Sequence, residues 1–186
     1  MRVLAPACVM LLLPGTVLAG ICSKFGSPSY QADRTVSIGG ETIRSKIFVS
    51  GARERQEIAA PGGRTEVRLA AGGAIIIFDP AAKTGMRLPP PPVPKIRLAK
   101  ENVRIGVHDD GPTKIVKMEV RDDKGDWKVT EEAVCRNDGI ILSQQFTVGG
   151  TGGQVVSGQM SQSAISVGPQ DQALFKLPSD VRLGKQ

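Results

Sequence analysis

Histidine, aromatic residues and long apolar runs are all scarce in this sequence of 186 residues. The single histidine, His108, excludes a zinc site built on several histidines and is the only possible base of a Ser-His-Asp site. Five Phe, one Trp and one Tyr are too few for a platform that stacks single-stranded nucleic acid. We therefore expect no nucleic-acid partner.

No stretch approaches the ~20 consecutive apolar residues of a transmembrane helix. The apolar run that follows Arg2 (VMLLL) is short and is interrupted by Pro14, which argues against the alternative of a membrane anchor. A positive start, a short apolar core and small residues up to Ala19 are typical of a secretory signal peptide. We predict that residues 1–19 are cleaved and that the exported chain is soluble. Lipidation is not expected, because Cys22 comes one residue too late.

Two cysteines, Cys22 and Cys135, remain after that cleavage. In an oxidising compartment such a pair permits a disulfide. The alternative is a buried, apolar Cys135 and a Cys22 that lies in a flexible N-terminus, 20–28. The residues alone leave both possibilities open.

Basic charge gathers in one segment. Residues 83–104 hold six Lys or Arg and one Glu. This segment predicts a solvated face or, next to the proline-rich connection 88–94, contact with an envelope protein or an anionic membrane surface.

Alternation of polar and apolar residues predicts short β-strands along most of the chain. The pattern is clear at 43–49, 65–69 and 115–120, and the apolar run 74–78 (AIIIF) predicts a central strand. Turn sequences separate about nine or ten such strands between 30 and 165. Helix is expected only as short pieces within 95–103 and 169–175. We expect one mainly β domain, 29–183, with a tail at 184–186.

Candidate catalytic and metal motifs fail for lack of the required spacing. The glycines of 149–153 are not followed by the Lys-Ser/Thr of a phosphate loop, and 122–126 lacks the ligand spacing of a calcium loop. The segment 108–112 (HDDGP) predicts a loop whose single imidazole makes a poor metal site. We predict a non-catalytic protein with no metal and no cofactor.

Four segments, in order along the chain, resemble motifs of one family. They are 48–57 (FVSGARERQE), 75–83 (IIIFDPAAK), 135–142 (CRNDGIIL) and 165–178 (ISVGPQDQALFKLP). Together they are similar to the periplasmic superfamily of the outer-membrane lipoprotein carriers LolA and LolB. The resemblance implies a periplasmic location and a single curved antiparallel sheet that forms a half-open β-barrel with one or two short helices. It also implies a partner for Cys135 upstream, where Cys22 is the only cysteine left.

The resemblance further implies a binding fold, with a lipid, an acyl chain or another apolar ligand in the concave face of the sheet. We predict that this face is lined by apolar residues: Ile47, Val49, Val67, Leu69, Met86, Val116, Met118, Leu142 and Phe146. The alternative is that these side chains fill an ordinary core, and that the protein is a structural or protein-interaction module of the cell envelope. In either case Phe175 and Leu177, two residues apart in an extended tail, are predicted to anchor that tail to the core.

Overall fold

The computed structural model describes residues 21–26, 28–71, 74–88, 100–122, 124–149 and 155–184. The predicted signal peptide and most of the proline-rich connection lie outside these ranges, as do residues 150–153 of the glycine-rich segment. Within the described ranges, no helix has both the length and the apolar character that a membrane crossing requires.

The described chain forms one open, curved sheet of twelve strands in the order β12-β6-β5-β4-β3-β2-β1-β11-β10-β9-β8-β7. The elements are β1 (Ser29–Ile38), β2 (Glu41–Ser50), β3 (Arg53–Ala60), β4 (Arg64–Ala71), β5 (Ala74–Asp79), β6 (Thr84–Leu88), η2 (Lys100–Asn102), β7 (Val103–Asp110), β8 (Thr113–Arg121), β9 (Trp127–Arg136), β10 (Ile141–Gly149), β11 (Val155–Val167), η4 (Gln172–Phe175) and β12 (Arg182–Leu183). The predicted mainly β fold, with a single open sheet and very little helix, is confirmed. All pairings are antiparallel except that of β12 with β6.

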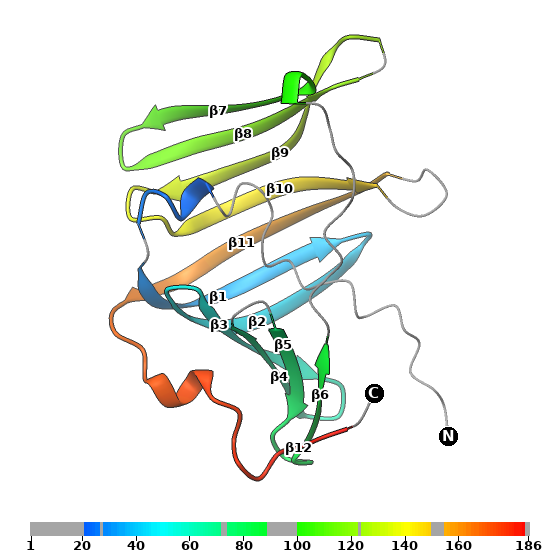
Figure 1. The fold of residues 1–186 in the computed structure, drawn as a ribbon, viewed down its shortest axis with the longest axis vertical. Coiled ribbons are helices and arrows are strands. Elements are labelled where there is room, and N and C mark those ends of the chain that lie inside the picture. The colour runs from blue at the N-terminus through cyan, green and yellow to red at the C-terminus, as the bar shows by residue number, and fades with distance from the viewer. Residues whose placement is uncertain are drawn as a thin grey trace.

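Two meanders of consecutive strands make up the sheet. Strands β1 to β6 form one, strands β7 to β11 form the other, and the pairing of β1 with β11 joins them. In Figure 1 the strands of the second meander lie across the upper part, and β3 to β6 turn steeply away below β1 and β2. The centre of the sheet is therefore a contact between the two ends of the domain.

The two faces of the sheet follow from the register. Tyr30 lies opposite Val49 and Ala32 lies opposite Ile47, so these side chains share one side, which we call the Tyr30 face. Tyr30, Ala32 and Ile47 are buried there with Ile140. The other side, which we call the Leu69 face, carries a separate buried cluster of Val67, Leu69 and Phe78.

The segment Ile21–Gly26 packs on the Tyr30 face of the second meander. Cys22 and Cys135 are fully buried and joined in a disulfide with a Cα–Cα distance of 5.8 Å. Their cluster includes Val116 and Ala133. A Cβ on Gly26 would collide with the carbonyl of Asp138, so glycine is required where the segment crosses the β9–β10 turn. The expectation of a flexible stretch 20–28 is thus corrected for this segment, because the disulfide and its apolar neighbours hold it against the sheet.

The C-terminal segment covers the part of the Leu69 face that carries Val67, Leu69 and Phe78. The carboxylate of Asp171 accepts a hydrogen bond from the Ala173 amide and caps η4, the single turn that carries buried Phe175. Leu177 and Val181 then pack against the cluster of Val67, Leu69 and Phe78. Phe175 and Leu177 therefore turn toward the same side of the sheet, although Phe175 belongs to the helical turn and not to an extended tail.

One local expectation, the loop at 108–112, is corrected. His108 lies in β7 opposite Ile115 and not in a loop, because the turn is made by Gly111 and Pro112 alone. Asp109 and Asp110 therefore point to opposite sides of a strand. Residues 95–99 of the helical stretch expected within 95–103 lie outside the described ranges, and the described remainder forms η2 before β7 begins at Val103.

Candidate functional site

Six of the nine predicted ligand residues lie on the Tyr30 face. They are Ile47, Val49, Met86, Val116, Met118 and Phe146, as the strand registers place them. Ile47 and Val116 are fully buried, whereas Met86 is 51% exposed at the far end of the sheet. These residues lie on β2, β6, β8 and β10, from near one end of the sheet to near the other, and do not converge on one point.

Val67 and Leu69 lie on the opposite side of the sheet. Ile47 is opposite Gln56, and Gln56 is opposite Arg68, so Arg68 occupies the Tyr30 face and its two neighbours point away from it. The side chains of Val67 and Leu69 are buried under the C-terminal segment. Leu142 lies at a register irregularity between Ile141 and Ser143. The predicted set is therefore not one lining.

A cavity of about 430 Å³ opens where the β1–β2 turn meets β9, β10 and β11. Its lining includes Ser37, Ile38, Gly39, Gly40, Val129, Thr130, Glu131, Glu132, Gln145, Phe146, Thr147, Ser157, Gly158 and Gln159. Of the nine predicted residues only Phe146 is among them. A Cβ on Gly158 would collide with the Phe146 ring, so this glycine leaves room for the ring on the Tyr30 face. The volume is in the range of small-molecule sites, roughly 300–1,000 Å³, and the lining combines polar and apolar groups. The registers place Ser37, Glu132, Gln145 and Gln159 in one row on the Leu69 face, so the cavity does not belong to the Tyr30 face alone.

Polar side chains form a row across the Tyr30 face that the sequence analysis missed. We call this row the polar belt. Its members are Glu131 (β9), Gln144 (β10), Gln162 (β11), Arg34 (β1), Ser45 (β2), Glu54 and Gln56 (β3) and Arg68 (β4). Most of these side chains are buried, and buried polar groups need hydrogen-bond partners.

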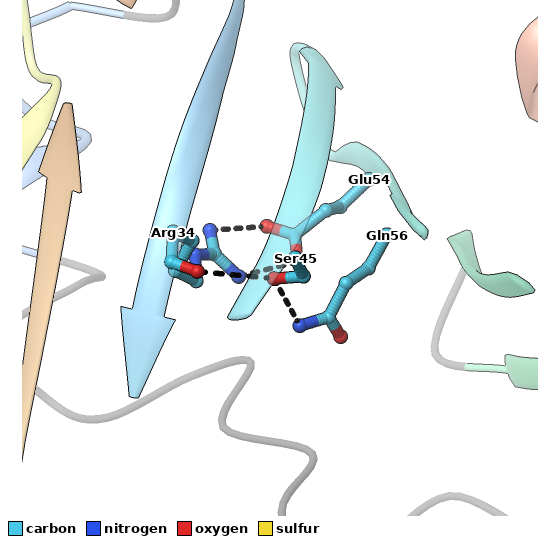
Figure 2. A network of polar contacts seen from close by, with 4 residues as sticks. All are labelled: Arg34, Ser45, Glu54 and Gln56. Atoms are coloured by element: carbon cyan, nitrogen blue, oxygen red, sulfur yellow. Dashed lines mark hydrogen bonds and ion pairs between the residues drawn. The ribbon is translucent and has the colours of Figure 1, made fainter. Parts of the chain in front are cut away.

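The middle of the polar belt is centred on Arg34 (Figure 2). Its Nη1 and Nη2 donate to Glu54 Oε1 and Oε2 at 2.7 and 2.9 Å, a bidentate ion pair. Gln56 Nε2 donates to Ser45 Oγ at 3.0 Å, and Ser45 Oγ donates to the Arg34 carbonyl at 3.5 Å. These bonds tie three neighbouring strands together on one face.

One donor and one acceptor in the polar belt have no hydrogen-bond partner among the described residues. They are Arg34 Nε and Gln162 Oε1, on residues that lie directly opposite each other across β1 and β11. The Tyr30 hydroxyl interacts with both residues. A buried unpaired polar atom costs about 1–3 kcal/mol, so a water or a ligand group that supplies both an acceptor and a donor would stabilise this part of the belt further. At the other end of the belt, Gln144 Nε2 donates to Glu131 Oε1, and Glu131 also lines the cavity.

Electrostatics in the polar belt shift two pKa values. Burial raises the pKa of Tyr30 because it disfavours the charged phenolate, and the nearby Arg34 guanidinium opposes this shift. Burial acts to lower the pKa of Arg34, but the Glu54 carboxylate outweighs it and the pKa of Arg34 is raised. Tyr30 is therefore neutral and Arg34 charged at neutral pH.

A pH titration of the single tyrosine tests this environment. Because the folded pKa of Tyr30 is raised, its neutral form stabilises the fold fully below the unfolded pKa of about 10, and this contribution is lost as the pH rises through the folded value. We expect the tyrosinate absorbance at 295 nm to appear only above about pH 10 and together with unfolding. A folded protein that titrates like the urea-unfolded chain would contradict the burial of Tyr30.

No group of three or more His, Cys, Asp and Glu side chains capable of holding a metal ion is found in the described part of the chain. The carboxylate of Asp122 accepts from the amides of Lys124 and Asp126, both at 2.9 Å, and pairs with Lys128 at 2.8 Å. This carboxylate therefore serves to close the β8–β9 turn.

Among solved structures, the fold is similar to the crystal structure of an uncharacterized conserved protein from Thermus thermophilus. The TM-score is 0.55 at 14% sequence identity, over 89% of this chain and 94% of that one. The two proteins share a fold. At this identity the likeness concerns the fold alone.

Two further structures match more distantly and carry no argument about function. A DUF1329 family protein from Desulfovibrio piger ATCC 29098 has a TM-score of 0.40 at 14% identity, over 89% of this chain and 96% of that one. MucB in complex with MucA(peri) has a TM-score of 0.35 at 12% identity, over 91% and 61% of the two chains. No protein-family model and no curated protein matches the sequence.

Proposed function

We propose that this chain is a non-catalytic, periplasmic binding protein that holds an amphiphilic lipid, an acyl chain with a polar head, on the Tyr30 face of its sheet. The signal-peptide pattern of residues 1–19 supports export. The buried disulfide of Cys22 and Cys135 supports an oxidising compartment, since such bonds are rare in the cytosol.

One observation carries the choice of ligand. The Tyr30 face places apolar side chains such as Met118 and Phe146 next to the polar belt, since both lie opposite Glu131 in the strand registers. A purely apolar ligand would leave the free donor of Arg34 and the free acceptor of Gln162 unsatisfied. A secondary amide or a hydroxyl group next to an acyl chain accepts from Arg34 Nε and donates to Gln162 Oε1, while the chain covers the aliphatic residues.

Binding of a dansyl-labelled fatty acid to the folded protein tests this proposal. We expect stoichiometric binding and displacement by lysophosphatidylglycerol. Met118→Glu should weaken binding at least tenfold, because it places a carboxylate directly opposite Glu131 on the same face. Ser161→Glu is the matched control, since Ser161 is exposed and lies opposite Thr35 on the Leu69 face, so it adds the same charge away from the site.

Circular dichroism must show the native strand signal for each variant. If Met118→Glu fails to fold, Met86→Glu replaces it, because Met86 is 51% exposed on the same face and tolerates a charge. Saturable binding that neither variant weakens would contradict the Tyr30 face as the site. Absence of saturable binding to the wild-type protein would contradict lipid binding altogether.

A second candidate function is a protein-interaction module of the envelope. It is favoured by two aliphatic side chains on the strand at the end of the sheet, Ile105 at 44% and Val107 at 51% exposed. Large aliphatic side chains that are exposed side by side on one strand are typical of a contact surface.

A further inference from the structure

The two ends of the sheet differ in whether the outer strand has a further pairing partner. At one end β12 pairs with β6, so the backbone groups of β6 have a partner. At the other end β7 pairs only with β8 within the described chain, and its outer edge is open. The two-residue turn at Gly111 and Pro112 makes Asp110 and Thr113 a hydrogen-bonded closing pair. Counting back from this pair, the N–H and C=O groups of Val103, Ile105, Val107 and Asp109 point outward.

Strand β7 is neither short nor interrupted by the proline or bulge that protects many open edges. It is eight residues long, contains no proline and shows no register shift against β8. Its outward-bonding residues include Ile105 and Val107, whose side chains are 44% and 51% exposed on the Tyr30 face. A flat, exposed edge of this length is a template for another strand.

The charges on β7 indicate which strand fits. Arg104 lies near its start, and Asp109 and Asp110 lie at its end. In an antiparallel pair of two β7 strands, the basic start of each strand meets the acidic end of the other. The register centred on Val107 places Val107 opposite its own copy and Arg104 opposite Asp110.

The contacts of β7 are compatible with this register. Arg104 is held in place by Glu119 through bonds of 2.6 and 3.0 Å and by the Trp127 ring at 4.5 Å. Glu119 and Trp127 lie on the β8 and β9 side, so the exposed remainder of the guanidinium is free to meet a second carboxylate. Asp109 is paired with Lys114, whereas Asp110 lies at the exposed end of the strand.

We propose that β7 pairs antiparallel with β7 of a second copy of this chain, about a two-fold axis normal to the sheet. The sheets of the two copies then continue into one another, with their Tyr30 faces on the same side. This interface does not depend on the lipid proposed above, because it uses backbone groups at the edge of the sheet.

Sedimentation equilibrium of the disulfide-bonded mature protein tests the proposal. We expect a dimer, and Val107→Lys should shift it to monomer, because two lysines would face each other across the axis. Val129→Lys is the matched control, since Val129 is a valine of equal exposure, 50%, away from the edge, and it should leave the dimer intact. Asp110→Arg should also weaken the dimer, because it places like charges opposite Arg104.

A covalent test keeps the proposal open to refutation if a lysine variant misfolds. Opposed residues in a hydrogen-bonded antiparallel pair have Cα atoms about 5.5 Å apart, which suits a disulfide. Val107→Cys should therefore give a covalent dimer on mild oxidation, whereas Val129→Cys should not. A wild-type protein that stays monomeric up to a concentration of about 100 μM, a hundredfold above a micromolar dissociation constant, would overturn the proposal. A dimer that persists equally in the Val107→Lys and Val129→Lys variants would also overturn it. The same holds if β7 of a monomer is found paired with a strand of another protein.

Discussion

Replacing Cys22 and Cys135 together with alanine is expected to lower the free energy of unfolding by about 4–5 kcal/mol. The two residues are 113 positions apart, so their disulfide restricts a large loop in the unfolded chain. Both are fully buried against Val116 and Ala133, so the change also removes apolar contacts. The melting temperature should fall by on the order of 10 °C.

Urea unfolding of the oxidised, reduced and double-alanine proteins measures this effect. Reduction should lower the midpoint of the wild-type protein, and the double variant, which has no disulfide to lose, serves as the control and should not respond to reductant. Intact-mass analysis after alkylation should find no free thiol in the unreduced protein. Two alkylated cysteines in that sample would show that the bond does not form in solution.

Replacing Phe175 with alanine is expected to destabilise the protein by about 3–5 kcal/mol. The ring is 8% exposed in η4, and the Arg53 guanidinium lies 5.1 Å from its centroid. Its loss also frees the segment that holds Leu177 over Val67 and Leu69. Truncation after Pro169 should have at least as large an effect, because it removes Phe175, Leu177 and β12 together.

Thermal unfolding followed by circular dichroism provides the measurement. Lys176→Ala is the matched control, because Lys176 is exposed beside Phe175 and does not belong to the buried cluster. We expect its melting temperature to stay within about 1–2 °C of the wild type. If Phe175→Ala and Lys176→Ala melt together, the C-terminal segment does not anchor to the Leu69 face.

Strand positions were predictable from the sequence because polar and apolar residues alternate. The pattern at 115–120 placed Val116 and Met118 on one side, and the register of β8 agrees. The registers between strands were not predictable in the same way. Ser50 pairs with Arg53 across a two-residue turn, whereas Ala60 pairs with Arg64 across a three-residue turn. One residue more in a turn exchanges the two faces of the next strand.

This exchange explains why Val67 and Leu69 do not share a face with Ile47 and Val49, as the prediction of one lining required. The prediction assumed that each strand turns its apolar side toward one common concavity. In the first meander both faces are buried, and the apolar side of β4 is covered by Leu177 and Val181. Alternation within a strand reports which residues share a face, but it does not report which face another segment covers.

The polar belt was missed for a related reason. Arg34 follows Ala32 and precedes Val36 in the alternation of β1, so it occupies an inward position. A single inward arginine gives no indication of its partner, because Glu54 lies 20 residues away. The ion pair depends on the pairing of three strands, which only the folded sheet brings together.

The position of β1 in the middle of the sheet has a consequence for the order of folding. Each meander is built from local hairpins, which form quickly, but the β1–β11 junction pairs Ile38 with Gly158, more than a hundred residues further along. Because β1 comes first along the chain and β11 near its end, one edge of β1 stays unpaired until nearly the whole chain is available for folding. Oxidation of Cys22 with Cys135 fastens the chain just ahead of β1 to the second meander before β11 arrives at its place. The disulfide shortens the loop that must close before β1 pairs with β11. We therefore expect the rate of refolding to depend on the disulfide more strongly than the rate of unfolding does.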